Sequence, residues 1–187
     1  MNPESFLHAY YDVYAKNIQP DWLFEKLQTC KESIVETNRS GGKLIFAGNG
    51  ASAAIASHVA LDFTKQGKIT STTFHDPALM TAFANDYGYD KGLAKMLECY
   101  MQPNDMAVFI SVSGESPNIV EAAKYVKSLD RKLVTFTGKS PDNSLKQLGD
   151  INFWVDSAAY NIVECIHMMW ITTMIDMIIG KSVYSVS

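Results

Sequence analysis

The sequence predicts one α/β domain built around a parallel sheet. Short apolar runs that predict buried strands alternate with amphipathic stretches of about 12 residues that predict helices. Glycine, proline and serine punctuate the junctions between them. Parallel neighbouring strands require such crossover helices, and the crossovers are right-handed. A chain of 187 residues has the size of a single domain with a sizeable core.

The first 40 residues predict a helical segment that precedes the α/β core. Apolar residues recur at helical spacing from Trp22 to Val35, and the pattern ends near Asn38, before Ser40 and two glycines. We expect residues 1–40 to serve subunit packing and residues 41–187 to form the core and the final helix. The first and last helices are expected either to pack together beside the sheet or to pack against another subunit.

The remaining elements follow in alternation. Strands are expected at residues 43–48, 69–74, 106–111, 132–137 and, with a weaker pattern, 151–155. Helices are expected at residues 51–64, from Asp76 onward, at 91–101, at 117–129 and at 157–179, where Gly180 ends the chain's longest apolar helix.

Composition excludes several classes of function. The net charge of −4 argues against non-specific nucleic-acid binding, and 47% hydrophobic residues argue against disorder. No stretch predicts a membrane span, because the most apolar one, residues 162–179, contains Glu164, His167 and Asp176. Three scattered cysteines indicate reduced thiols, and the start lacks the pattern of a secretory signal, so a cytoplasmic location is expected.

Two loops after predicted strands have the composition of an anion site. Glycines at 48 and 50 allow a tight turn before a helix whose amino terminus offers free amides, and Ser52 is placed either to cap that helix or to donate to a ligand. The segment from Ser111 to Ser116 places three hydroxyls around a glycine at a strand end. A third loop, residues 135–139, favours an ordinary strand end. The spaced glycines of dinucleotide-binding and ATP-hydrolysing loops are missing.

These loops, in this order, resemble a known family. GNGASAA at residues 48–54, SVSGESPNIVEA at 111–122 and LVTFTGK at 133–139 look like a SIS (sugar isomerase) domain. With FANDYGY at 83–89, the chain resembles the phosphoheptose isomerase branch more closely, over roughly residues 43–179. The resemblance implies a three-layer αβα sandwich that binds a phosphorylated sugar.

The resemblance also implies site residues, position by position. The implied substrate-binding residues are Asn49, Gly50, Ser52, Asn85, Asp86, Ser111, Ser113, Ser116 and Asn161. The implied catalytic residues are Asp62, Glu164, His58 and His167. Other interpretations stay open: a turn for the Asn-Asp pair, a surface or subunit contact for His58 and Asp62, and a satisfied core pair for Glu164 and His167.

Five positions depart from the family pattern. Val112 replaces a threonine of the phosphate loop, Asp62 a glutamate assigned as acid/base, Glu164 a glutamine and Asn161 an aspartate. Thr172 stands where the isomerases carry a second histidine, the proposed partner acid/base. The phosphate grip is therefore expected to persist while the acid/base pair is rebuilt or lost.

Zinc is a candidate cofactor by resemblance, because family isomerases often hold it. His58, Asp62 and Glu164 would supply three suitable ligands, with water as the fourth. The resemblance also implies a homotetramer whose long helices pack together and whose neighbouring subunit completes the site.

Two functions follow as expectations. The first is aldose–ketose isomerisation of a sugar phosphate such as sedoheptulose 7-phosphate, with Asp62 or Glu164 as the base. The alternative is a non-catalytic module that senses a phosphosugar or acts as an adaptor for a replication initiator. A nucleotide-binding Rossmann domain ranks third, because no acidic residue ends the second strand.

Overall fold

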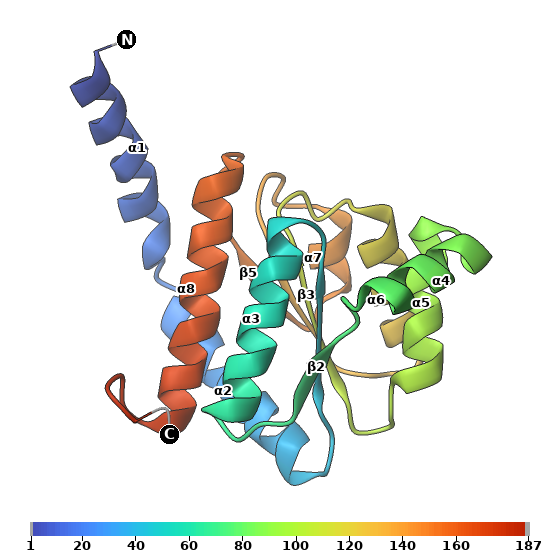
Figure 1. The fold of residues 1–187 in the computed structure, drawn as a ribbon. Helices are drawn as coiled ribbons and strands as arrows, with labels where there is room; N and C mark the ends of the chain where they lie inside the picture. The colour runs from blue at the N-terminus through green and yellow to red at the C-terminus, as the bar shows by residue number, and fades with distance from the viewer. Residues whose placement is uncertain (1, 186–187) are drawn as a thin grey trace.

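Five parallel strands form a single sheet in a computed structural model that describes residues 2–185 (Figure 1). The strands are β1 Leu44–Gly48, β2 Ser71–Thr73, β3 Met106–Ser111, β4 Leu133–Thr137 and β5 Ile151–Trp154. All residues of β1, β3 and β4 are buried, as expected for central strands that helices cover on both faces.

Helices occupy both faces of this sheet. They are α1 Pro3–Ile18, α2 Leu23–Arg39, α3 Ala51–Lys65, α4 Pro77–Tyr87, α5 Tyr89–Tyr100, α6 Pro117–Ser128, α7 Ser144–Leu148 and α8 Tyr160–Ile179. One face carries α2, α3 and α8, and the other carries α4 to α7 (Figure 1). The expected three-layer α/β sandwich is confirmed.

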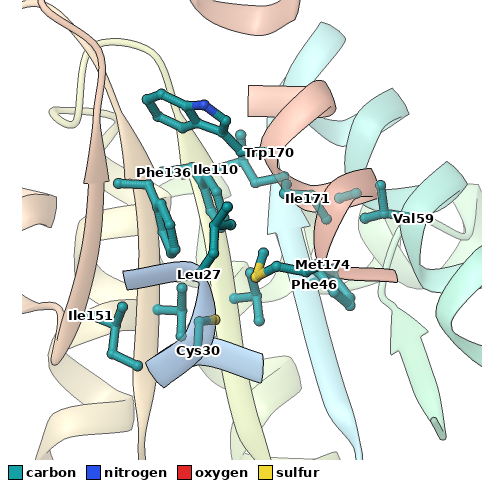
Figure 2. Close-up of a cluster of buried hydrophobic side chains, with 14 of the residues drawn as sticks. Leu27, Cys30, Phe46, Val59, Ile110, Phe136, Ile151, Trp170, Ile171 and Met174 are labelled. Carbon is teal, nitrogen blue, oxygen red and sulfur yellow. The ribbon is translucent and has the colours of Figure 1, made fainter. Parts of the chain in front are cut away.

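Each face of the sheet contributes its own apolar core. In Figure 2, Phe46 of β1 and Phe136 of β4 meet Leu27 of α2, Val59 of α3 and Trp170 of α8. These side chains are almost completely buried. A smaller core lies under α5, α6 and α7. The packing fixes the helices against the strands and thereby the positions of the loops between them.

The strand order places a topological switch point between β1 and β3. The order is β2-β1-β3-β4-β5, so the chain leaves β1 for β2 on one side and returns to β3 on the other. The loops after β1 and β3 therefore diverge, which leaves a crevice at the carboxyl edge of the sheet. Ligands of open α/β sheets bind at such points.

Helix α8 is long and apolar enough to cross a membrane, by length and composition alone, with a mean hydropathy of 1.6. The fold supplies the reason for this composition. Eight of its residues, among them Ile166, Trp170 and Met174, are buried against the sheet and α2. A core helix that is apolar on most sides has this sequence signature.

Helix α1 stands apart from the body of the domain (Figure 1). Its carboxyl end is tied down, because the Trp170 indole nitrogen donates to the Ile18 carbonyl at 2.8 Å and the Asp156 amide donates to Asn17 Oδ1 at 3.1 Å. Its other half exposes Phe6 and Tyr11, at 49% and 64%. An apolar helix face without cover in one chain indicates a contact surface.

Three local predictions differ from the structure. Strand β2 covers Ser71–Thr73 and is shorter than expected, since it lies at the sheet edge with one neighbour. Helix α7 was not predicted, because its five residues are too few to show a period. Asn85 and Asp86 lie in the last turn of α4, which Gly88 ends, and not in a free loop.

Candidate functional site

A cavity of about 110 Å³ lies at the switch point, between the loops that follow β1 and β3. It is lined by Asn49, Ser52, Ser111, Val112, Ser113, Ser116, Tyr160 and Glu164. We call it the serine cleft. It brings together five of the predicted binding residues and one predicted catalytic residue from three segments that are distant in sequence.

The first loop delivers Ser52 to the serine cleft by a close approach of backbone and helix. A Cβ at Gly48 would lie 2.7 Å from Ser52 Cβ, so only glycine allows α3 to begin this near the strand. The amino-terminal cap of α3 is Gly50, so Ser52 lies inside the helix and does not cap it. Of the two roles expected for this serine, ligand binding is the one left open. Gly50 itself does not line the cleft.

The second loop leaves its hydroxyls available to a ligand. Ser116 occupies the cap position of α6 but makes no side-chain cap bond, and its Oγ lies 3.2 Å from Ser111 Oγ. Ser113 Oγ accepts from the Glu115 amide at 3.2 Å, which shapes the turn. The amino termini of α3 and α6 also open at this edge, with amides that their own helices leave unpaired. Hydroxyls and helix amino termini together suit a phosphate.

An amide pair, which the sequence did not reveal, joins the loop after β1 to the first turn of α6, which follows the second loop. Asn49 and Asn118 exchange hydrogen bonds through their side chains, both at 2.9 Å, and the Tyr89 hydroxyl donates to Asn49 Oδ1 at 3.0 Å. Asn118 is buried. The sequence signal that could have identified Asn118 was its position directly after Ser116 and Pro117, at the start of a helix. The pair fixes Asn49 at the wall of the serine cleft.

Tyr160 lines the serine cleft, which the sequence did not reveal. It begins α8, and the Lys139 amine donates to its hydroxyl at 3.1 Å while lying 4.5 Å from the ring centre. Lys139 comes from the third loop, the one that favoured an ordinary strand end. The third loop therefore reaches the rim of the cleft through a lysine.

Glu164 is the acid of the serine cleft. It extends from the second turn of α8, and among the described residues none donates a hydrogen bond to its carboxylate. Burial raises the pKa of this carboxyl, because the charged form loses solvation. A raised pKa increases the protonated fraction near neutral pH, which suits a group that takes and returns a proton.

His58 and Asp62 form a pair outside the serine cleft. His58 Nε2 lies 3.2 Å from Asp62 Oδ2, and the side chain of Asp62 is only 16% exposed. Ten residues separate Ser52 from Asp62 on α3, which at 1.5 Å per residue is roughly 15 Å along the axis. Asp62 lines a different cavity, with Thr172 of α8. Within one chain, Glu164 and Asp62 therefore line two different cavities.

His167 does not reach the serine cleft. Its side chain is fully buried, and its Nε2 donates to the Thr137 carbonyl at 3.0 Å. Burial lowers the pKa of this histidine to about 4, so the ring is neutral. Nδ1 has no partner among the described residues. The structure buries this ring between the sheet and α8, away from the lining of the serine cleft, so the predicted catalytic role of His167 has no support from the geometry of one chain.

The other predicted residues lie apart from the cleft. Asn85 and Asp86 are exposed and bonded to each other at 2.9 Å, and Asn161 is exposed on the first turn of α8. The candidate zinc ligands are not assembled either. Across residues 2–185, no three histidine, cysteine or acidic side chains come together as a metal-binding group. His58 and Asp62 meet, but Glu164 does not join them in one chain.

The chain is similar to known proteins along most of its length. A family model described as the SIS domain matches residues 11–138. The phosphoheptose isomerase of Aliarcobacter butzleri is 32% identical over 178 residues, covering 91% of this chain and 92% of that protein. The probable phosphoheptose isomerase of Thermoplasma acidophilum is 36% identical over 165 residues, covering 84% and 89%. The solved phosphoheptose isomerase of Neisseria gonorrhoeae superposes with a TM-score of 0.84 at 27% identity, covering 94% and 98%.

Proposed function

Because the chain belongs to the SIS domain family, in the branch of the phosphoheptose isomerases, we propose that it interconverts the ketose and aldose forms of a sugar phosphate. One observation carries this proposal. The Glu164 carboxyl, whose pKa is raised by burial, lines the same cavity as the hydroxyls of Ser52, Ser111 and Ser116. An anion site and an acid/base group thus share one cleft.

The serines hold the phosphate in this proposal. Hydroxyls of Ser111 and Ser116 donate to phosphate oxygens, and the amino termini of α3 and α6 add amides and a favourable dipole. Val112 is buried and contributes no hydroxyl. The loops bind the substrate but take no part in breaking its bonds.

Glu164 performs the proton transfer. Its carboxylate removes a proton from carbon 1 of the ketose, and the electrons of that C–H bond form the double bond of an enediol while the carbonyl oxygen takes up a proton. Glu164 then returns its proton to carbon 2, and the hydroxyl of carbon 1 loses its proton as the aldehyde forms. Atoms and charge balance, and no oxidant or reductant is consumed.

His58 and Asp62 act apart from the serine cleft, beside the second cavity that residues of α3 and α8 line. We assign them the transfer of the proton between the two oxygens, at the cleft of the same chain or of a neighbour. Their separation from Ser52, roughly two turns for His58 and three for Asp62 along α3, supports a site that a second subunit completes. Asn85, Asp86 and Asn161 are exposed in one chain and are proposed to contact the sugar there.

The alternative of a non-catalytic sensor or adaptor is not favoured. The relatives that match over most of the chain are isomerases, and the acid of the serine cleft is present. A sensor would need the serines but would have no use for an unpaired, partly buried carboxyl beside them.

The test is turnover of sedoheptulose 7-phosphate in D₂O. We expect a heptose phosphate of unchanged composition that carries deuterium at carbon 2, because the proton on Glu164 exchanges with solvent. A preparation that binds the sugar phosphate in a thermal-shift assay but gives no product, beside an active control isomerase, would refute the isomerase and leave the sensor.

We also propose that the chain works in the cytoplasm as a homotetramer, with residues 1–40 packing against neighbouring subunits. The uncovered face of α1, with Phe6, Leu7 and Tyr11 exposed at 49%, 52% and 64%, supports this. Replacing Leu7 and Tyr11 by glutamate should lower the mass measured by light scattering, while an exposed control, Lys124→Ala on α6, should not. An unchanged mass in the double variant would contradict the role of α1.

A further inference from the structure

A chain of hydrogen bonds runs from the carboxyl-terminal tail to the His58–Asp62 pair. We propose that Tyr184 and Gln66 are positioning residues that hold the Asp62 carboxylate and, through it, the ring of His58. The consequence for turnover rests on the role that the proposed function gives to Asp62. The positioning itself does not rest on it, and the experiment below separates the two.

Two of the four residues share one face of α3, and a third, Gln66, is the cap residue that continues that face at the end of the helix. His58, Asp62 and Gln66 are spaced four residues apart, so their side chains lie one above another along the helix. Both oxygens of Asp62 are engaged: Oδ2 faces His58 Nε2 at 3.2 Å, and Oδ1 accepts from Gln66 Nε2 at 2.9 Å. The carboxylate is therefore fixed in rotation, which a single contact would not achieve.

Tyr184 determines which way the amide of Gln66 points. A glutamine amide has a donor end and an acceptor end, and a half-turn would place its oxygen against Asp62. The Tyr184 hydroxyl donates to Gln66 Oε1, with the Asp176 carboxylate as a second acceptor beside it, and the Gln66 nitrogen faces the Asp62 carboxylate. The hydroxyl thus acts through one intermediate residue, without touching Asp62.

The tail returns to α3 by a defined turn. Gly180 ends α8 in the left-handed conformation, with φ of 82°, and residues 181–185 then run back beside the cavity that Asp62, Gln66, Thr172 and Asp176 line. Burial and the carboxylates of Asp176 and Asp62 raise the pKa of Tyr184, which keeps its hydroxyl protonated as a donor. These groups face Tyr184 from both α3 and α8.

The contact with Asp62 selects one tautomer of His58. Because Asp62 accepts from Nε2, the neutral ring carries its proton on Nε2 and presents an unprotonated Nδ1. The side chain is 50% exposed, and in the proposal its Nδ1 serves a substrate hydroxyl or a neighbouring subunit. Fixing the tautomer is the step by which a tail residue influences proton transfer.

The experiment combines spectroscopy with kinetics on the full chain. The variants are Tyr184→Phe and Gln66→Met, with Tyr100→Phe as the matched control, since Tyr100 lies at the end of α5 against Phe74. Histidine-selective labelling resolves the chain's four histidines, and a His58→Gln sample assigns the signal of interest. We expect one Nε2-protonated form of His58 in the wild type and in Tyr100→Phe, and a mixture of tautomers in both test variants.

Kinetics test the consequence for the reaction. We expect kcat to fall about 10-fold in both test variants with KM changed less than about twofold, since a positioning residue affects the chemical step more than binding. Thermal unfolding confirms that each variant is folded, and Tyr184→Phe, which retains its ring, serves if Gln66→Met does not fold. Absence of turnover by the wild type would refute the proposed function but not the positioning of Asp62 and His58.

The inference is overturned by the spectra independently of turnover. A His58 signal that is identical in Tyr184→Phe, Gln66→Met and the wild type excludes positioning through this chain. A changed signal with unchanged kcat in an active enzyme excludes the catalytic consequence and restricts Tyr184 to anchoring the tail.

Discussion

Two separate cavities, both lined by residues of α3 and α8, each contain one acid in opposite surroundings. In the serine cleft, Glu164 has no hydrogen-bond donor among the described residues. In the second cavity, Asp62 is held by His58 and Gln66 on both oxygens. Burial raises the pKa of the first carboxyl, while partners fix the second.

Glu164 and Asp62 illustrate two ways in which a protein prepares a carboxyl for chemistry. An unpartnered acid in a partly dry cleft can carry a proton and give it up with little change in its surroundings. A fully bonded carboxylate instead orients its neighbour, as the aspartate of a catalytic triad orients its histidine. We therefore expect substitutions at Glu164 and substitutions around Asp62 to have different kinetic signatures.

The largest expected effect is on turnover by Glu164→Gln. The amide keeps the shape of the side chain but cannot accept and return a proton, so kcat should fall about 1,000-fold with a small change in KM. Glu121→Gln, an exposed glutamate on α6, is the control and should behave as the wild type. Steady-state kinetics with sedoheptulose 7-phosphate measure both. If Glu164→Gln keeps more than a tenth of the activity, the proton passes elsewhere.

The second-largest expected effect is on the pH dependence of stability. It comes from His167, which lies three residues after Glu164 but in the core. Its folded pKa of about 4 lies below its ordinary value of 6.5, so its contribution to stability is complete above pH 6.5 and is lost as pH falls. By pH 4 the loss amounts to about 3 kcal/mol. His167→Gln should unfold more easily at pH 7 and should lack this part of the pH dependence.

Urea unfolding between pH 7.5 and pH 4 provides the measurement for His167. The informative quantity is the difference in slope between the wild type and the variant, because other groups titrate equally in both. Parallel curves would show that His167 is accessible in the folded state, and would return it to the list of catalytic candidates.

The smallest expected effect is on binding by the serines. Ser111→Ala and Ser116→Ala each remove one hydroxyl from the phosphate, so KM should rise about 10-fold with kcat within a few-fold. Ser128→Ala, at the other end of α6, is the control, since its hydroxyl donates to the Tyr125 carbonyl. A kcat loss that exceeds the KM change in either variant would show that the serine acts in the chemical step.

The strands and the serine cleft could be predicted because local patterns determine them. Buried strands such as β3 and β4 are continuous apolar runs, and the hydroxyls of Ser111 and Ser116 follow one of them directly. The loops after β1 and β3 leave the same edge of the sheet on either side of the switch point, so they border one crevice. The meeting of these loops with Ser52 and Glu164 follows from that topology.

The roles of groups along the helices were harder to predict, because spacing gives the face of a helix but not its depth. His167 belongs to the buried row that contains Val163, Ile166 and Trp170, and this row was the overlooked signal. Likewise, His58 and Asp62 share a face, but only the rise along α3 shows how far they lie from Ser52. The zinc set failed to assemble for the same reason.

The amide pair between Asn49 and Asn118 has a thermodynamic consequence for the ligand. It links the loop after β1 to the start of α6, where the loop after β3 ends, so conformational entropy of these segments is lost during folding and not when the phosphate binds. Affinity for the sugar phosphate is thus partly stored in the stability of the apo fold. Loosening the pair would weaken binding even though neither loop lost a single phosphate contact.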